Sequence, residues 1–448
     1  MFVSPRVKTM RLLMLGIFLL VGISEVRAVP EIQSWSTPTG GRVLFVPTEG
    51  LPMLDLRMVF DAGSARDGQE FGIAALTAGM LDSGAGALDA DTIAERLDAI
   101  GAILSSGATR DSAHVALRTL TDAPKLKEAL EVFETVISQP RFENKDFERE
   151  KNRVLLGIQQ KGEDPGEISE MAFMKVLYGE HPYAHPVEGV KETVEKLTAK
   201  DLVRFHKTAY TRGNAILVLV GQVTRAEAEA IAVQVYSRIP EGAAKPALED
   251  PQALSGSETL TTPFPSEQTH VYAGVLGLKA NDPDYFPLVV GNHILGGSGL
   301  VSRIMEEVRE KKGLAYSAFS YFLPMRVQGP YQIGLQSKNA SAREATEIAV
   351  RTLREFVDKG PTDKELDAAK KNIIGGYVLR LDSNAKLIGE VAAIGFLGRP
   401  LDWLNRYTAK VEAVTREDIQ RAFKARIDPD RLKTVMVGGI KPAANGGQ

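Results

Sequence analysis

The chain contains no cysteine among its 448 residues. Disulfide bridges, thiolate zinc sites, a cysteine nucleophile and a lipidated N-terminal cysteine are therefore excluded. Histidine is scarce, at six residues, and a formal net charge of −3 provides no electrostatic footprint for nucleic acid or for an anionic membrane. The hydrophobic content of 44% is that of a soluble globular protein, and the length predicts about two to four domains.

Long apolar runs are missing except near the N-terminus. There, three basic residues precede an apolar or glycine run at 12–23, and small residues before Val29 offer a cleavage site. The run is shorter than the ~20 residues that a helix needs to span a bilayer. We therefore expect a signal peptide at residues 1–28 and a periplasmic or secreted mature chain without stable membrane insertion. An uncleaved membrane anchor is the alternative.

Internal repetition is the strongest organisational signal. The segment Thr198–Arg204 aligns with Thr415–Arg421, and the apolar run Val218–Gly221 aligns with Val435–Gly438 at the same offset of 217 residues. Both copies have the pattern of a threonine-capped helix with acidic residues in its first turn, followed by an apolar strand. A fixed offset over more than twenty residues predicts a duplicated domain.

The predicted boundary lies where composition changes. Residues 240–251 are rich in proline, alanine and charge and have no apolar period, as expected for an exposed linker. We predict an N-terminal domain at 29–239, a linker at 240–258, a C-terminal domain at 259–441 and a tail at 442–448.

Each predicted domain mixes strands and helices. Strand-like patterns cover 43–46, 53–60, 114–119, 270–276, 316–322 and 331–335, and helical spacing covers 92–100, 125–138, 144–160, 342–357 and 363–380. Short strands between pairs of long helices predict α+β domains, each with a mostly antiparallel sheet covered by helices on one face.

The segment Phe71–Leu81 carries the framework of a metal-binding helix without its ligands. Residues at i, i+3 and i+4 share one helix face, where two histidines and a glutamate can bind zinc and activate its water. The segment resembles the zinc helix of the pitrilysin and insulinase family of inverted zincins, which includes the mitochondrial processing peptidase. The resemblance implies two facing homologous domains around a chamber. It places the family's His, Glu and His at Ala75, Ala78 and Gly79.

The fourth family position, a glutamate ligand on a later helix, falls near Gly157. None of these four residues can coordinate a metal, so we expect no metal or other cofactor in this chain. Among the histidines only His181 and His185 are close in sequence, and the proline after each excludes a regular helix through both. A structural loop is the expected role of this segment, and a metal role is the alternative.

A second motif lies far downstream, after the glycine-rich run 295–303. Arg309 falls in a predicted helix that ends at Gly313, and Tyr316 begins the following strand. An arginine can donate to a peptide carbonyl, and a tyrosine hydroxyl can donate to a developing oxyanion. The segment resembles the family motif in which an arginine and a tyrosine seven residues apart position the substrate backbone. A solvated arginine and a packing aromatic are the alternative.

A weaker substrate-binding prediction concerns Ser105, Ser106 and Gly107. They lie where the family has an edge strand that accepts substrate by β-addition, in which backbone groups do most of the binding. Ser105 replaces the asparagine usual in the family. An ordinary edge strand is the alternative.

Together, the resemblance implies the metal-free subunit of a heterodimeric zinc endopeptidase, inactive alone. A homologous partner with His-x-x-Glu-His would supply zinc, and Arg309 and Tyr316 would act on an extended peptide. A catalytically inactive scaffold or peptide-binding protein of the same fold is the alternative, and a homodimer stays open. Hydrolysis by unrelated chemistry is disfavoured, since no serine or threonine lies in a recognisable nucleophile motif. The sequence names neither substrate nor partner.

Overall fold

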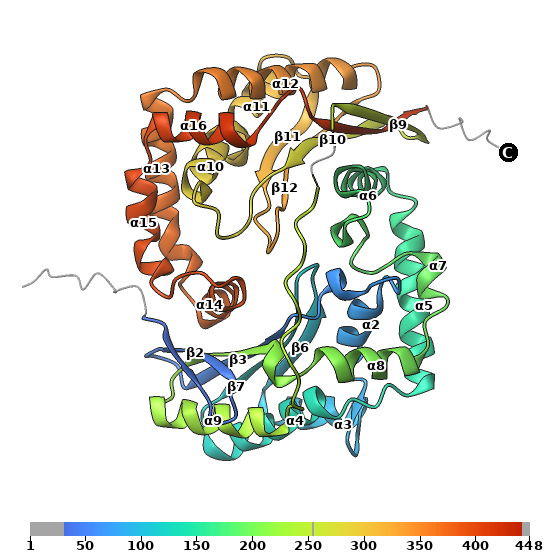
Figure 1. Cartoon of the computed structure of the whole chain (residues 1–448), viewed down its shortest axis with the longest axis vertical. Coiled ribbons are helices and arrows are strands. Elements are labelled where there is room, and N and C mark those ends of the chain that lie inside the picture. The colour runs from blue at the N-terminus through green and yellow to red at the C-terminus, as the bar shows by residue number, and fades with distance from the viewer. Residues whose placement is uncertain (1–30, 253–254, 441–448) are drawn as a thin grey trace, which may run out of the picture.

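The computed structural model describes residues 31–252 and 255–440, which form two halves stacked one above the other (Figure 1). The predicted signal peptide and C-terminal tail lie outside the described residues. Among the helices in these two ranges, none is long and apolar enough to cross a membrane.

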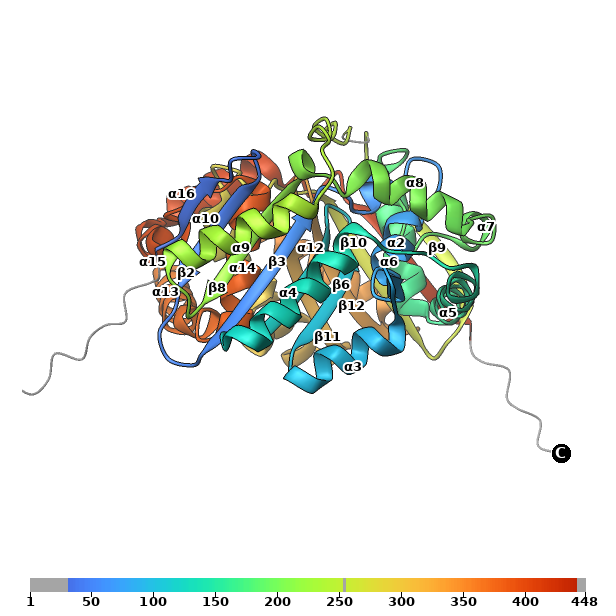
Figure 2. The same cartoon turned by 90° about the horizontal axis from the view of Figure 1, so that it is seen from below.

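The first half is built on a six-stranded sheet in the order β1-β2-β8-β3-β7-β6. Its strands are β1 (Gln33–Ser36), β2 (Arg42–Pro47), β3 (Met53–Phe60), β6 (Ile103–Ala108), β7 (Ala113–Leu120) and β8 (Ala215–Gly221). The pairings are antiparallel except that of β2 with β8. One apolar core joins its outward face to α2 (Ile73–Gly79), α3 (Ala90–Ile100), α4 (Ala123–Ser138), α5 (Asn144–Lys161), α8 (Ala199–Ala209) and α9 (Arg225–Arg238). Figure 2 shows α3, α4 and α9 over this face.

The second half is built on a five-stranded sheet in the order β11-β12-β10-β13-β9. Its strands are β9 (Glu258–Pro265), β10 (Gln268–Leu276), β11 (Ala315–Phe322), β12 (Pro330–Lys338) and β13 (Lys433–Ile440). Only β9 and β13 pair in parallel. A second core joins its outward face to α10 (Tyr285–Asn292), α11 (Arg303–Met305), α12 (Ala342–Lys359), α13 (Asp363–Tyr377), α15 (Trp403–Ala413) and α16 (Arg416–Arg426).

The two halves repeat one topology, which confirms the predicted α+β duplication. The order β2-β8-β3-β7-β6 in the first sheet corresponds to β9-β13-β10-β12-β11 in the second, and the parallel pair has the same place in both. Thr198 is the N-cap of α8 and Thr415 is the N-cap of α16, each in a capping box with an aspartate three residues later. The predicted domain boundaries themselves stay predictions. The segment 240–252 contains neither helix nor strand, and Gly242 accepts a backbone hydrogen bond from Gly213 at 3.1 Å.

One helix of each half packs against the sheet of the other half. Phe173 on α6 (Pro165–Tyr178) lies in an apolar cluster with Val435 and Val437 of β13, so a first-half helix covers the second sheet. Val391 and its neighbours on α14 (Asn384–Leu397) pack on β2, β3 and β8, so a second-half helix covers the first sheet. The two sheets thus face each other with α6 and α14 between them (Figure 1).

The predicted helix before Gly313 is less regular than expected. It consists of α11 followed by a π-helical turn at Glu306–Glu310. The N–H of Lys311 donates to the carbonyl of Glu306 at 2.9 Å, an i→i+5 bond that adds one residue to the turn. Arg309 lies in this widened turn. Gly313 then adopts φ +63, the left-handed conformation that favours glycine at a helix end.

Candidate functional site

The helix α2 keeps its place although it carries no metal ligand. Asp67 is buried, and its carboxylate accepts hydrogen bonds from the N–H groups of Gly72, at 2.7 Å, and Ala74, at 3.1 Å, at the N-terminus of the helix. Burial raises the pKa of Asp67 to about 8. Gly72 has φ +98, and a Cβ there would lie 2.6 Å from the carbonyl oxygen of Glu188. Glycine is therefore required where α2 meets the loop that contains Glu188.

That loop holds the two histidines of the His-Pro segment in structural contacts. The ring of His185 stacks on Phe71 with centroids 4.1 Å apart, immediately before α2. The Nε2 atom of His181 lies 3.1 Å from the carbonyl oxygen of Glu249, which ties the loop to the segment between the halves. Both contacts agree with the structural role that the sequence favours.

The four family metal positions lie on two helices that contact each other, α2 and α5. Ala75 is half-buried, Ala78 is fully buried and Gly79 is exposed. Gly157 faces open space, since nothing lies within 4 Å of a Cβ built on it. A Cβ on Gly79 would lie 3.3 Å from Oε1 of Glu150, which is paired with Arg153 on α5.

Zinc does not fit the donor set at this place. Methyl groups and hydrogen atoms cannot ligate a cation, and Glu150 alone is short of the three protein ligands that a catalytic zinc takes. In residues 31–252 and 255–440, no group of three or more histidine, aspartate or glutamate side chains could hold a metal ion.

The structure brings Arg309 and Tyr316, the two residues predicted to position a substrate, close together. The guanidinium carbon of Arg309 lies 5.4 Å from the centre of the Tyr316 ring, within cation–π range. Tyr316 is 78% exposed, and it lies at a register shift of β11 between Ala315 and Ser317. The carboxylate of Glu310 is 3.7 Å from Arg309, at the long end of an ion pair. Both functional groups are thus accessible to a ligand.

The predicted substrate strand is β6, an edge of the first sheet that pairs only with β7. Ser105 is exposed, whereas the hydroxyl of Ser106 donates to the carbonyl of Ala78 at 2.7 Å. This bond holds the free edge of the sheet beside α2, the helix that lacks the family's metal ligands. Gly107 lies opposite His114 of β7. The contacts agree with an edge strand; peptide addition to it stays a prediction.

Sequence reasoning missed a group of polar residues on the inward face of this sheet. Asp55 and Arg57 alternate with the core residues of β3, and Arg118 of β7 donates to Asp55 at 2.9 Å. The available signal was the presence of two charged residues within the otherwise apolar strand 53–60.

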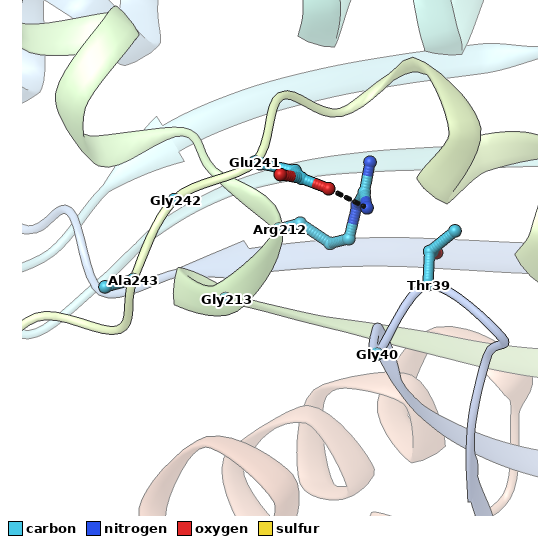
Figure 3. Close-up of a pocket in the computed structure, with 7 residues that line it drawn as sticks. All are labelled: Thr39, Gly40, Arg212, Gly213, Glu241, Gly242 and Ala243. Carbon is cyan, nitrogen blue, oxygen red and sulfur yellow. Dashed lines mark hydrogen bonds and ion pairs between the residues drawn. The ribbon is translucent and has the colours of Figure 1, made fainter.

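A surface hollow near the segment between the halves contains no arrangement of side chains typical of a catalytic site (Figure 3). Its side chains include Arg212, whose Nη1 lies 3.4 Å from Oε1 of the exposed Glu241. The remaining lining residues are small, and none of the predicted site residues takes part: Thr39, Gly40, Gly213, Gly242 and Ala243. A paired arginine among small residues does not indicate a catalytic site.

Known proteins share the sequence and the fold. Residues 43–191 match the family described as insulinase, peptidase family M16, and residues 196–373 match the family described as the peptidase M16 inactive domain. A solved structure of a peptidase M16 inactive domain from Pseudomonas fluorescens has a TM-score of 0.88 and 38% identity. The match covers 92% of this chain and 99% of that one.

Two curated relatives add to this result. The "Non-peptidase homolog YmxG" of Helicobacter pylori is 25% identical over 96% of this chain and 98% of its own length. The "Mitochondrial-processing peptidase subunit beta" of Lentinula edodes is 26% identical over 84% of each chain. The chain belongs to the M16 (insulinase) peptidase family, as the sequence motifs predicted.

Proposed function

We propose that this protein is the metal-free subunit of a two-chain zinc endopeptidase. The observation that carries the proposal is an asymmetry between two sites. The four metal positions lack every donor, whereas Arg309 and Tyr316 lie together with their polar groups accessible. A purely structural role requires neither an exposed tyrosine at a strand irregularity nor an arginine stacked on it.

The roles follow from the chemistry of these groups. An extended peptide adds to the free edge of β6, the guanidinium of Arg309 donates to a peptide carbonyl, and the Tyr316 hydroxyl donates to the oxyanion that develops during hydrolysis. Zinc, which activates the attacking water, belongs to the partner. This chain orients the peptide and closes the site.

The partner in this proposal is a homologous chain with the His-x-x-Glu-His motif. The name of the Lentinula edodes relative, a subunit of a processing peptidase, supports a multi-chain assembly. We also propose that the mature chain begins near Val29 and functions in the periplasm or outside the cell. N-terminal sequencing of the native protein tests the cleavage point, since a chain that still begins at Met1 contradicts it.

The decisive experiment mixes the purified chain with its zinc-bearing homologue and a peptide. We expect cleavage only by the mixture, and a large loss of rate when the chain carries Arg309→Ala. Lys311→Ala is a matched control, because Lys311 is exposed and its ion pairs within the described residues are with Glu306 and Glu307. Full activity of the homologue alone, or an unchanged rate with Arg309→Ala, rejects the proposal.

A second candidate is a peptide-binding or scaffold protein without any peptidase role. The name of the Helicobacter pylori relative, a non-peptidase homologue, favours it. Peptide capture by this chain without cleavage in any pairing distinguishes this function from the first.

A further inference from the structure

Arg57 is a cation without a counter-ion in the part of the chain that the structure describes. It is half-buried, no hydrogen bond or ion pair joins it to another described residue, and its Nε atom is shielded from solvent and unpartnered. Burial lowers the pKa of Arg57. Shielding an unpaired charge from water costs free energy, and an anion from outside the chain would offset that cost.

Arg118 on the same face provides a direct contrast. Its guanidinium donates to Asp55 at 2.9 Å, whereas among the described residues no carboxylate pairs with Arg57. On the β2–β8–β3 side, α14 covers the sheet with apolar side chains. Burial, and to a lesser extent the charge of Arg57, lowers the pKa of His114 on β7. Arg57 therefore lies near His114 of β7, the strand that pairs with the free-edge strand β6.

The strand register leaves a path from Arg57 to that edge. Arg57 pairs with Ala116 of β7, and Ala116 pairs with Ser105 of β6, so only small side chains separate Arg57 from the edge. In the adjacent row His114 lies opposite Gly107, and a Cβ on Gly107 would lie 3.3 Å from Cε1 of its ring. The Nδ1 atom of His114 is shielded and unpartnered among the described residues.

We infer that the row formed by Arg57, Ala116 and Ser105 is a specificity site for an acidic side chain of a peptide paired to β6. Arg57 is the charged group that binds the carboxylate of that side chain. The inference rests on the proposed function, because it needs a peptide at β6. A peptide on β6 lies three strand spacings from Arg57, or about 14 Å between Cα atoms. Fully extended arginine and glutamate side chains that lie along the sheet and are joined by a hydrogen bond span this gap, and aspartate, one methylene shorter, fits less well.

The test measures binding of fluorescein-labelled peptides to the full mature chain by fluorescence anisotropy. The probes are ten-residue Ser/Thr/Ala peptides in which one glutamate moves along the sequence, each with a glutamine twin. A charge-assisted hydrogen bond predicts about a tenfold preference for glutamate at one position. Arg57→Gln removes that preference and leaves the affinity for the glutamine twin unchanged.

Arg118→Gln is the control on the same face. We expect it to keep the glutamate preference and to lower the melting temperature, because it removes the ion pair of the buried Asp55. Arg57→Gln removes an uncompensated charge and is expected to keep or raise the melting temperature. A lowered melting temperature for Arg57→Gln would assign Arg57 a structural role and overturn the inference.

The remaining outcomes separate this inference from the proposed function. If the glutamine peptides bind and are cleaved with the zinc-bearing partner, but glutamate gives no preference or the preference survives Arg57→Gln, only the inference fails. The same holds if Arg118→Gln abolishes the preference. If no peptide binds, the inference and peptide presentation by β6 both fail.

Discussion

The two halves share one topology and differ in what they do with it. In the first half the helix α2 occupies the family's metal position without a ligand, and in the second half the widened turn and β11 keep Arg309 beside Tyr316. The comparison shows that the fold does not depend on the metal. Ile73 and Leu76 anchor α2 in the core, and Asp67 caps it, so the helix forms without a metal ligand at exposed Gly79.

The largest expected effect concerns the contact that joins the halves. Phe173→Ala, on α6, should lower the free energy of unfolding by about 3–5 kcal/mol, since it opens a cavity between the first-half helix and the second sheet. Urea unfolding measures this, with Leu156→Ala as an exposed control. Two separate transitions in the wild-type protein would show that the halves unfold independently and contradict the coupling.

The second prediction tests the role proposed for the second half, in which Tyr316 acts on the peptide. Tyr316→Phe should reduce the cleavage rate of the two-chain mixture about 100-fold, because it removes one donor to the oxyanion and keeps the ring beside Arg309. Single-turnover rates measure the chemical step. Tyr321→Phe, an exposed tyrosine on the same strand, should retain the rate. Equal losses in the two variants would exclude a specific role for Tyr316.

The third prediction restores metal ligands at the family's metal positions. The triple variant Ala75→His, Gly79→His, Gly157→Glu should bind one zinc ion, since i and i+4 share a helix face and α5 contacts α2. At a free zinc concentration of 100 times Kd, the stabilisation is about 2.7 kcal/mol. Metal analysis and melting with and without EDTA measure it, and glutamines at the three positions are the control. No zinc uptake would mean that these positions no longer converge.

The smallest expected effect concerns the pH dependence of stability at His206. Phe423 occupies the same place in the second copy of the repeat. His206 is buried on α8, its Nε2 lies 2.8 Å from the carbonyl oxygen of Ile137, and burial lowers its pKa to about 4. In the unfolded chain the His206 imidazole is protonated as the pH falls below about 6.5, whereas in the folded chain it stays neutral to a lower pH. The free energy of unfolding therefore falls as the pH drops below about 6.5. Between pH 7 and 5 the loss is about 2 kcal/mol.

His206→Phe should remove this residue's contribution to the pH dependence of the free energy of unfolding between about pH 7 and 5. Urea midpoints at pH 7 and pH 5 measure the difference, and the other histidines contribute equally to both proteins. A parallel decline of the variant and the wild type would rule out His206 as the source.

Sequence patterns predicted the repeat, most elements and the proximity of Arg309 to Tyr316, because capping residues, periodicity and motif spacing are local properties. The packing of α6 and α14 on the sheets of the opposite halves was not predictable, since periodicity shows that α6 has an apolar face, with Phe173 and Leu177, and does not show which sheet that face contacts. The π-helical turn at Arg309 depends on one shifted backbone bond, which side-chain periodicity does not reveal. The isolation of Arg57 likewise depends on which carboxylates lie near it in space.

The exchange of helices has a consequence for the integrity of the chain. Proteolysis within the mostly exposed segment 240–250 would cut the covalent connection, yet each fragment would still hold a helix against the sheet of the other fragment. A nicked protein should therefore migrate as one particle under native conditions. Either fragment produced by itself would present an uncovered apolar sheet face to water and is expected to aggregate.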